Sequence, residues 1–279
     1  MPIILIINGF YRTGTTIVSR ILKESNPDIY YFHEPTSSLC VHEIMSHGLG
    51  KVHGLHGWAI YDDFHKLPSA YLDLFIRKHQ VYDFVLEPFR GVIVLDAIHS
   101  FHMKSMVKSC HLHLILDIVI NRYGCKAIQI VRDAVETFLD VLPLEVASNE
   151  LLLAKLVDGK VKCEKYMTMF WILDIYNSVS RRFNKYVDEN DCIGKFIVAF
   201  MELQNYAVKL CRANPKCMIL NFDELVEKPI EVLSRVEGFT GLKVNKQLAK
   251  YIDKSKAKKS KAWLRKKFEE KMKELGYLS

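Results

Sequence analysis

The N-terminal stretch carries a short apolar run followed by an apolar pattern of helical period. Residues 3–7 are all isoleucine or leucine, a β-branched run of strand length that ends at the turn signal Asn8-Gly9. Beyond Gly14, apolar side chains recur at helical spacing, as Ile17, Val18, Ile21 and Leu22. The pattern predicts a buried strand, a glycine-bearing loop and a helix that begins near Gly14.

The rest of the chain alternates between short apolar runs and longer helical patterns. The runs predict buried strands at residues 29–32, 91–96, 126–131 and 217–222, and the helical patterns cover residues 110–123, 163–187 and 193–213. Strands that alternate with helices are typical of a parallel sheet. We therefore expect one α/β domain over residues 1–279, in three layers, with a central parallel sheet of four or five strands.

Composition and cysteine usage narrow the class of protein. The chain has 279 residues, of which 49% are hydrophobic, so a full core is possible in one large domain or two small ones. No apolar run reaches the roughly 18 residues that a membrane span needs. The seven cysteines lack metal-type spacing and are odd in number. They predict free thiols, a reducing compartment and a cytoplasmic location.

The net charge of +7 belongs to the C-terminal segment. Residues 243–279 contain thirteen Lys and Arg against four Asp and Glu, a balance of +9, whereas the other residues balance at −2. Such a segment favours a polyanionic partner, either a multiply phosphorylated cofactor or nucleic acid. The alternative is an ordinary solvated helix rich in lysine.

Residues 9–16 are candidates for an anion-binding loop. Backbone N–H groups of such a loop and of the following helix N-terminus favour a phosphate or sulfate group. Gly9 and Gly14 have the spacing of the nucleotide P-loop, but Thr15 stands where the lysine that reaches a triphosphate should follow. The nearby cation is Arg12 instead.

The loop and a second segment resemble the sulfotransferases that use 3′-phosphoadenosine 5′-phosphosulfate (PAPS). Arg12-Thr13-Gly14-Thr15-Thr16 is similar to the family's 5′-phosphosulfate loop. Val131-Arg132-Asp133-Ala134-Val135-Glu136 resembles the family's Val-Arg-Asp-Pro-x-Glu, which implies that Arg132 binds the 3′-phosphate. The family's serine eight residues later falls on Asp140, so either Thr137 serves in its place or the 3′-phosphate site is modified.

The C-terminal part resembles the same family. Phe222-Asp223-Glu224-Leu225, Pro229 and Phe239-Thr240-Gly241-Leu242 follow its order. The resemblance implies that a basic C-terminal segment, residues 243–279, closes over the cofactor, with Lys261 as a cofactor-binding residue. Trp263 either contacts adenine or anchors the last helix.

Two residues are candidates for the general base. Glu34 follows the strand at 29–32, and because ligands of a parallel sheet lie beyond the carboxyl ends of its strands, it should share an edge with the loop. The phrase Glu34-Pro35 resembles the carbohydrate-type subgroup, although a carboxylate here could also cap a helix. His99, just beyond the run at 91–96, is the second candidate, by resemblance to the cytosolic subgroup.

The resemblance implies sulfuryl transfer from PAPS to an acceptor hydroxyl of a glycan, a glycolipid or a small alcohol, with no metal and with residues 36–90 shaping the acceptor pocket. Two alternatives stay open. One is a small-molecule kinase that uses ATP and Mg²⁺, with Asp96 and Thr15 or Thr16 as metal ligands. The other is a non-catalytic nucleotide- or nucleic-acid-binding protein.

Overall fold

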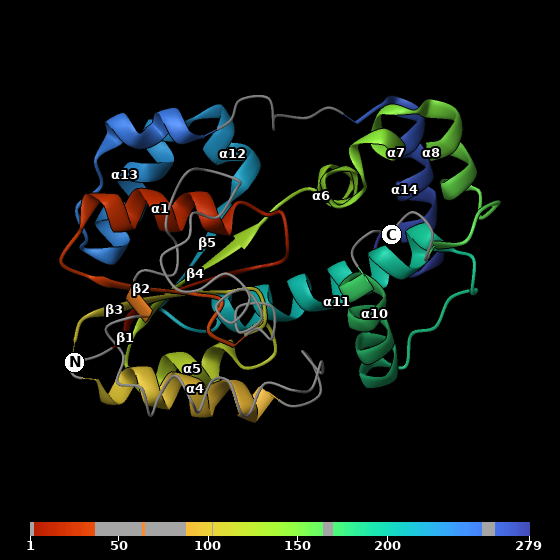
Figure 1. The fold of residues 1–279 in the computed structure, drawn as a ribbon. Coiled ribbons are helices and arrows are strands. Elements are labelled where there is room, and N and C mark those ends of the chain that lie inside the picture. Colours follow the sequence, from red (N-terminus) through yellow and green to blue (C-terminus); the bar gives the residue numbers. More distant parts are fainter. Residues whose placement is uncertain (1–2, 37–62, 65–87, 102, 164–169, 253–259) are drawn as a thin grey trace.

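The computed structural model describes residues 3–36, 63–64, 88–101, 103–163, 170–252 and 260–279, and its centre is a parallel sheet (Figure 1). The five strands stand in the order β2-β3-β1-β4-β5. Their bounds are β1 Ile3–Gly9, β2 Tyr30–His33, β3 Ser105–Ser109, β4 Lys126–Val131 and β5 Cys217–Asn221. The predicted α/β class and parallel sheet are confirmed.

Helices cover both faces of the sheet (Figure 1). One face carries α1 (Thr15–Ser25), α12 (Phe222–Glu227) and α13 (Pro229–Thr240), with the short 3-10 helix η2 (Lys246–Tyr251) against α1 and α13. The other carries α4 (Pro88–Ser100) and α5 (Leu116–Tyr123). The long helix α11 (Cys192–Arg212) contacts α5, β4 and β5 and continues beyond the sheet.

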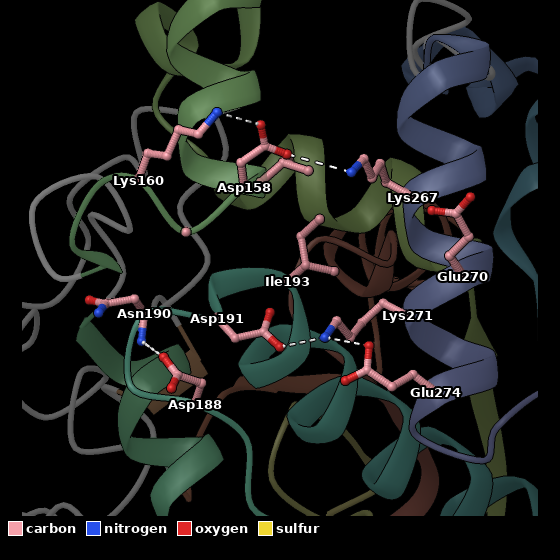
Figure 2. A pocket seen from close by; sticks show the side chains of 12 residues that line it. Asp158, Lys160, Asp188, Asn190, Asp191, Ile193, Lys267, Glu270, Lys271 and Glu274 are labelled. Atoms are coloured by element: carbon pink, nitrogen blue, oxygen red, sulfur yellow. Dashed lines mark hydrogen bonds and ion pairs between the residues drawn. The ribbon is translucent and has the colours of Figure 1, made fainter.

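A second group of helices stands beyond the carboxyl ends of the strands (Figure 1). It contains α6 (Ala134–Val141), α7 (Leu144–Ser148), α8 (Glu150–Val157), α10 (Phe170–Phe183) and α14 (Ala262–Glu274). A cleft of about 660 Å³ opens between α8, residues 188–193 and α14. Its charged side chains pair with one another, as Lys267 does with Asp158 at 3.6 Å and Lys271 with Asp191 at 2.9 Å (Figure 2).

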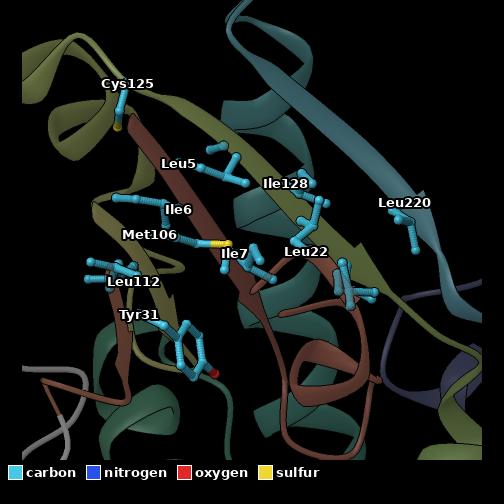
Figure 3. Packing of buried hydrophobic residues seen from close by; sticks show 14 of the residues in the cluster. Leu5, Ile6, Ile7, Leu22, Tyr31, Met106, Leu112, Cys125, Ile128 and Leu220 are labelled. Carbon is cyan, nitrogen blue, oxygen red and sulfur yellow. The ribbon is translucent and has the colours of Figure 1, made fainter. Parts of the chain in front are cut away.

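The buried apolar side chains form two clusters, one around the sheet and one within the helical group. In the first, residues of the strands such as Leu5, Ile128 and Leu220 pack together with Leu22 of α1 (Figure 3). Phe10 follows β1 directly, yet it belongs to the second cluster and meets Phe200 of α11 edge-on at 5.1 Å. The β1–α1 loop therefore lies where the two clusters meet.

The predicted strand at residues 91–96 is wrong, because this run lies within α4. Val92, Leu95 and Ile98 are buried while Ile93 is 42% exposed, which is the spacing of a helix with one face on the sheet. A continuous apolar run does not distinguish a buried strand from a buried helix.

The sequence analysis missed β3, although β3 lies between β1 and β2 in the sheet. Its sequence, Ser-Met-Val-Lys-Ser, has no apolar run, yet every residue of it is buried. The predicted helix at 110–123 is correct only in its second half, since α5 begins at Leu116. The residues between β3 and α5 thus form a loop at the carboxyl edge of the sheet.

The prediction of free thiols is wrong for four cysteines. Disulfides join Cys163 to Cys192 and Cys211 to Cys217, while Cys110 and Cys125 are free and buried. Spacing in the sequence did not show these pairs. Cys192 begins α11, Cys211 lies in the last turn of the same helix, and Cys217 begins β5. Within the described residues, no helix combines the length and apolar character of a membrane span.

Two predicted regions fall largely outside the described residues. They are the acceptor-pocket region at 36–90 and the lysine-rich part of the tail at 253–259.

Candidate functional site

The β1–α1 loop has the backbone geometry of a tight turn into a helix. Gly14 adopts a left-handed conformation, with φ of +90°, and a Cβ there would lie 2.1 Å from the ring of Phe222. A Cβ at Gly9 would lie 2.7 Å from Oγ1 of Thr13. Both positions thus require glycine, and the predicted loop with its two glycines has a physical basis.

The N-terminus of α1 is open to an anion. Gly14 caps the helix without a side-chain hydrogen bond, and the first turn contains no acidic residue. Thr15 and Thr16 are the first two residues of the helix, and Thr13 is held just before it by a 2.6 Å bond from Oγ1 to the carbonyl of Phe10. Unsatisfied N–H groups and the positive end of the helix dipole meet here, so the local structure favours a bound phosphate or sulfate.

Two residues at this edge have strained backbones. Arg12 has φ of 63° and Glu34 has φ of 47°; Asn184 is the third non-glycine residue with positive φ in the described part of the chain. Such conformations persist where the surrounding structure enforces them, which is common at functional sites. The side chain of Arg12 is exposed, as the sequence interpretation of a cation facing a ligand requires.

Glu34 lies at the predicted edge of the sheet and forms a buried ion pair that the sequence did not reveal. It follows β2, and Lys108 of the neighbouring strand β3 donates from Nζ to Oε1 of Glu34. The backbone N–H of Cys110 donates to the other carboxylate oxygen at 2.9 Å. Burial by itself would raise the pKa of Glu34, but Lys108 and His111 hold it well below the ordinary glutamate range.

Lys108 keeps its charge in this pair. Burial alone would lower its pKa, but Cys110 and Glu34 raise it above the ordinary lysine value. The thiol of Cys110 lies 3.4 Å from Nζ of Lys108 and 3.9 Å from Oγ1 of Thr15. This chain of contacts connects the ion pair to the first residue of α1, so the anion-binding loop and Glu34 belong to one site.

His111 stands next to Glu34 in the loop after β3. Its Nδ1 lies 3.6 Å from Oε2 of Glu34, and its Nε2 forms a hydrogen bond with the hydroxyl of Tyr11. Burial, with Glu34 and Cys110, raises the pKa of Tyr11 well above its ordinary value, so this hydroxyl stays protonated. A carboxylate on one side of an imidazole is an arrangement that orients it for proton transfer on the other side.

Buried polar side chains fix the loop that carries His111. Asn8 of β1 donates to Gln129 of β4 at 2.6 Å and accepts at its Oδ1 from the backbone N–H of Leu112 at 3.2 Å. Ser109 accepts at its Oγ from the backbone N–H of His111 at 3.1 Å. The loop is therefore attached to two strands of the sheet.

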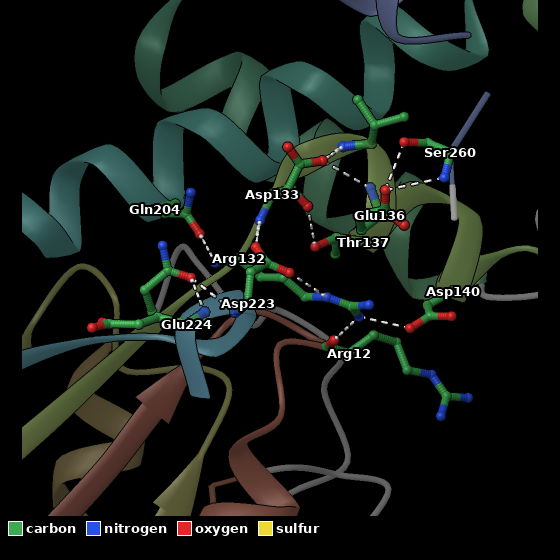
Figure 4. A network of polar contacts seen from close by, with 12 residues as sticks. Arg12, Arg132, Asp133, Glu136, Thr137, Asp140, Gln204, Asp223, Glu224 and Ser260 are labelled. Carbon is green, nitrogen blue, oxygen red and sulfur yellow. Dashed lines mark hydrogen bonds and ion pairs between the residues drawn. The ribbon is translucent and has the colours of Figure 1, made fainter. Parts of the chain in front are cut away.

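Arg132 follows β4 and reaches the β1–α1 loop (Figure 4). Its side chain is 2% exposed, and Nη1 donates at 2.6 Å both to the carbonyl of Arg12 and to Asp140. Nε lies 3.8 Å from Asp223. The structure thus brings Arg132 beside the loop, and it brings Asp140 into direct contact with the arginine.

The same corner holds the start of α14. Glu136 accepts from the backbone and hydroxyl of Ser260 (Figure 4), and from Arg265 at 2.5 Å. Arg265 also binds Asp133, which caps α6 through the N–H groups of residues 135 and 136. These contacts attach the described part of the C-terminal segment to the residues that follow β4.

Lys261 and Trp263 lie against α8 and not in this corner. Lys261 pairs with Glu150 at 2.7 Å, with its side chain 56% exposed, and the indole of Trp263 donates to the same carboxylate at 3.1 Å. Trp263 also packs against the helical cluster. This placement supports the interpretation of Trp263 as an anchor for the last helix.

His99 and Asp96 are both distant from the loop in the fold. They belong to α4, whose last turn leads into the start of β3 and therefore lies at the amino edge of the sheet. The ring of His99 packs on Tyr123 at 4.8 Å, and Asp96 pairs with Arg122 at 2.7 Å. Asp96 does not end a strand, so the residue on which the kinase alternative placed Mg²⁺ is not available to it.

Sequence reasoning missed Lys108, Cys110 and His111 because it missed β3. In the sheet, Lys108 pairs with His33 of β2 on one side and with Ile7 of β1 on the other. This register places Lys108 near the carboxyl ends of the strands, where ligands bind. A lysine near the end of a short segment, followed by a histidine, was the available indication. No group of three metal-ligand side chains occurs in the part of the chain that the structure describes.

The fold and the site define an α/β protein with a helix N-terminus open to an anion, beside buried acid–base residues. The family model of the sulfotransferase domain matches residues 2–275, so the chain belongs to the sulfotransferase family. An uncharacterized protein of Archaeoglobus fulgidus is 27% identical over 300 residues, which cover 98% of this chain and 94% of that protein.

Solved structures similar to this chain are sulfotransferases as well. The sulfotransferase domain of the olefin synthase of Synechococcus PCC 7002 is 13% identical, with a TM-score of 0.45 over 99% of this chain and 94% of that one. A sulfotransferase of Mycobacterium avium is 12% identical, with a TM-score of 0.43 over 99% of this chain and 77% of that one. The family assignment rests on the sequence match.

Proposed function

We propose that the protein transfers a sulfuryl group from PAPS to an acceptor hydroxyl. The observation that carries this proposal is the contact between two features of one edge of the sheet. The open N-terminus of α1 is connected through Thr15 and Cys110 to the buried pair of Glu34 and Lys108. An anion site and a buried group of proton-transfer residues are what sulfuryl transfer to a hydroxyl requires.

The residues of the loop fit the phosphosulfate end of such a donor. The backbone N–H groups of Gly14, Thr15 and Thr16 and the exposed side chain of Arg12 would hold its oxygens. The N–H of Thr13, also a candidate by resemblance, already donates to the carbonyl of Phe10 at 3.2 Å. When bound, the donor supplies the sulfuryl group. Fixed donors at this place stabilise charge on the phosphate oxygen, and removal of one such donor typically costs ~100- to 1000-fold in rate.

His111 is the proposed general base, with Glu34 as the residue that orients it. The pKa of Glu34 is held low by Lys108 and His111, and both of its oxygens already accept hydrogen bonds, so the carboxylate is a weak base. A neutral imidazole presents one ring nitrogen as a proton acceptor. The proton of the acceptor hydroxyl would pass to Nε2, the nitrogen that now meets the hydroxyl of Tyr11.

The remaining predicted site residues stay proposals. Arg132 is close enough to the loop to meet the sugar end of a nucleotide, since it binds the carbonyl of Arg12. Lys261 is proposed from the family resemblance alone, because in the structure it binds Glu150. His99 is not carried forward as a base, because α4 places it at the other edge of the sheet.

The acceptor is proposed to be a hydroxyl of a glycan, a glycolipid or a small alcohol, held in part by residues 36–90, with residues 243–279 covering the nucleotide. Nucleic acid is not favoured as a partner, since described lysines of the tail pair with acids of their own chain, as Lys246 does with Glu237. A cytoplasmic location was inferred from free thiols, and the two disulfides remove that support.

Calorimetric titration tests the donor class. We expect adenosine 3′,5′-bisphosphate to bind with micromolar affinity and ATP with Mg²⁺ to bind much more weakly. We also expect Arg12→Ala to lower the affinity for the bisphosphate. Sulfur-labelled PAPS, offered with a panel of glycans and alcohols, then identifies the acceptor. Binding of ATP with Mg²⁺ alone, or of neither nucleotide, would overturn the proposed function.

A further inference from the structure

The guanidinium of Arg132 is already neutralised by carboxylates of its own chain. It binds Asp140 at 2.6 Å, and Asp223 lies 3.8 Å from Nε. The arginine is almost fully buried, so solvent screens these contacts little. The positive charge of an arginine paired in this way is compensated before any ligand binds.

The corner as a whole is acidic. Among the described residues, the side chains of Arg132 and Arg265 pair with four carboxylates, which belong to Asp133, Glu136, Asp140 and Asp223. Figure 4 shows these carboxylates with Arg132. The side chain of Arg12 points away from this corner. Burial raises the pKa of Asp223, and the neighbouring charges of Asp133 and Glu136 add to that increase. The charges of the described residues at this corner therefore disfavour a further negative charge.

A hydroxyl group suits the same corner. A phosphate on the ribose would have to displace Asp140 from Arg132, or lie against a carboxylate that repels it. A ribose hydroxyl can instead donate a hydrogen bond to a carboxylate, which is how acidic residues hold the ribose in dinucleotide-binding folds. Asp140, at 18% side-chain exposure, is accessible to such a group.

Thr137 does not offer a substitute site for a phosphate. Its side chain is fully buried, and its hydroxyl donates to the carbonyl of Asp133 at 2.8 Å. The shift in register that would replace the family's serine by Thr137 is therefore not supported, and Asp140 is the residue that faces Arg132.

We propose that Asp140 determines donor specificity, so that the site takes an adenosine 5′-phosphosulfate with a free 3′-hydroxyl about as well as its 3′-phosphorylated form. This inference rests on the proposed function, because it assumes that the 5′ end of the nucleotide occupies the β1–α1 loop. Arg132 then holds Asp140 and the loop carbonyl, and the carboxylate of Asp140 receives the ribose hydroxyl.

The wild-type protein supplies the first test. Titrations with adenosine 5′-monophosphate and adenosine 3′,5′-bisphosphate give two dissociation constants, and we expect the bisphosphate to be preferred by less than about tenfold. A preference above roughly a hundredfold in the wild type would overturn the inference while leaving the proposed function intact. If neither nucleotide binds, it is the proposed function that fails.

Substitutions of Asp140 supply the second test. In Asp140→Asn and Asp140→Ser the preference for the bisphosphate should rise roughly ten- to a hundredfold, since a repelling charge is removed and Arg132 is released. Asp158→Asn is the control, because it removes the same charge from a solvent-accessible pair with Lys160 just beyond α8. An unchanged preference in folded Asp140 variants, or an equal rise in the Asp158 variant, contradicts the role of Asp140.

Discussion

Nδ1 of His111 lies 3.6 Å from Oε2 of Glu34, on the opposite side of the ring from the hydroxyl of Tyr11. The carboxylate is ionised, because Lys108 and His111 hold its pKa down. It therefore favours the tautomer that carries its proton on Nδ1 and leaves Nε2 as the acceptor.

Replacement of His111 should remove proton transfer and leave nucleotide binding in place. We expect His111→Asn to lower turnover by ~100- to 10,000-fold, which is the usual contribution of a positioned base. Titration should show the affinity for adenosine 3′,5′-bisphosphate nearly unchanged, since the loop at residues 9–16 is intact. Turnover is measured by transfer of labelled sulfate to the acceptor found in the panel.

The matched control is His99→Asn, which removes an imidazole at the amino edge of the sheet. Its turnover should stay close to that of the wild type. Should the His99 variant lose activity while the His111 variant keeps it, the base is not at the position that the structure favours.

The ion pair of Glu34 and Lys108 should stabilise the fold strongly. Glu34→Gln leaves Lys108 buried without its partner charge, and loss of one member of a buried pair typically costs ~3–5 kcal/mol. Turnover should fall as well, because His111 loses the group that orients it. Urea unfolding at neutral pH measures the first effect, and the transfer assay measures the second.

The pH dependence of this pair has a defined sign. The pKa of Glu34 is lower in the folded than in the unfolded protein, so its contribution is complete above the ordinary glutamate pKa of about 4.3 and is lost as the pH falls below it. The difference in unfolding free energy between wild type and Glu34→Gln should therefore shrink towards about pH 3. Asp96→Asn, which breaks an exposed pair with Arg122, should cost less than about 1 kcal/mol.

Much of the fold could be predicted where strand, loop and helix are local in sequence. The β1–α1 unit and β4 with Arg132 were found because apolar runs, glycines and a following cation stand together in the chain. The apolar run at 91–96 was wrongly predicted as a strand, because a helix packed on the sheet can contain as continuous an apolar run as a strand. β3 could not be predicted, because its sequence has no apolar run and its burial comes from its place between two other strands of the sheet.

The site was predicted only in the parts that do not depend on β3. Glu34 and the loop could be placed on one edge from the rule for parallel strands, whereas Lys108 and His111 reach Glu34 through the register of β3. In the sequence, Asp140 stands out only as a carboxylate at a position where the family resemblance implies a 3′-phosphate site. The structure shows it in an ion pair with Arg132.

The two disulfides should differ in what they contribute to stability. In the chain-entropy model, the bridge between Cys163 and Cys192, 29 residues apart, stabilises by ~3–4 kcal/mol, and the bridge between Cys211 and Cys217, 6 residues apart, by about 2 kcal/mol. Paired alanine substitutions compared by urea unfolding measure each value. Alkylation of the denatured, unreduced protein should leave these four cysteines unmodified, and their full alkylation would exclude both bridges.

Gly14 should be the most sensitive glycine of the anion-binding loop. In Gly14→Ala the new methyl group would lie 2.1 Å from the buried ring of Phe222, and φ of +90° is unfavourable for alanine. We expect a loss of ~2–4 kcal/mol in unfolding free energy, together with a more than tenfold loss of affinity for adenosine 3′,5′-bisphosphate. Gly124→Ala is the control: its φ is +64° with no atom within 4 Å, so it should cost about 1 kcal/mol and leave affinity unchanged. Equal effects of the two substitutions on affinity would show that the loop does not hold the nucleotide.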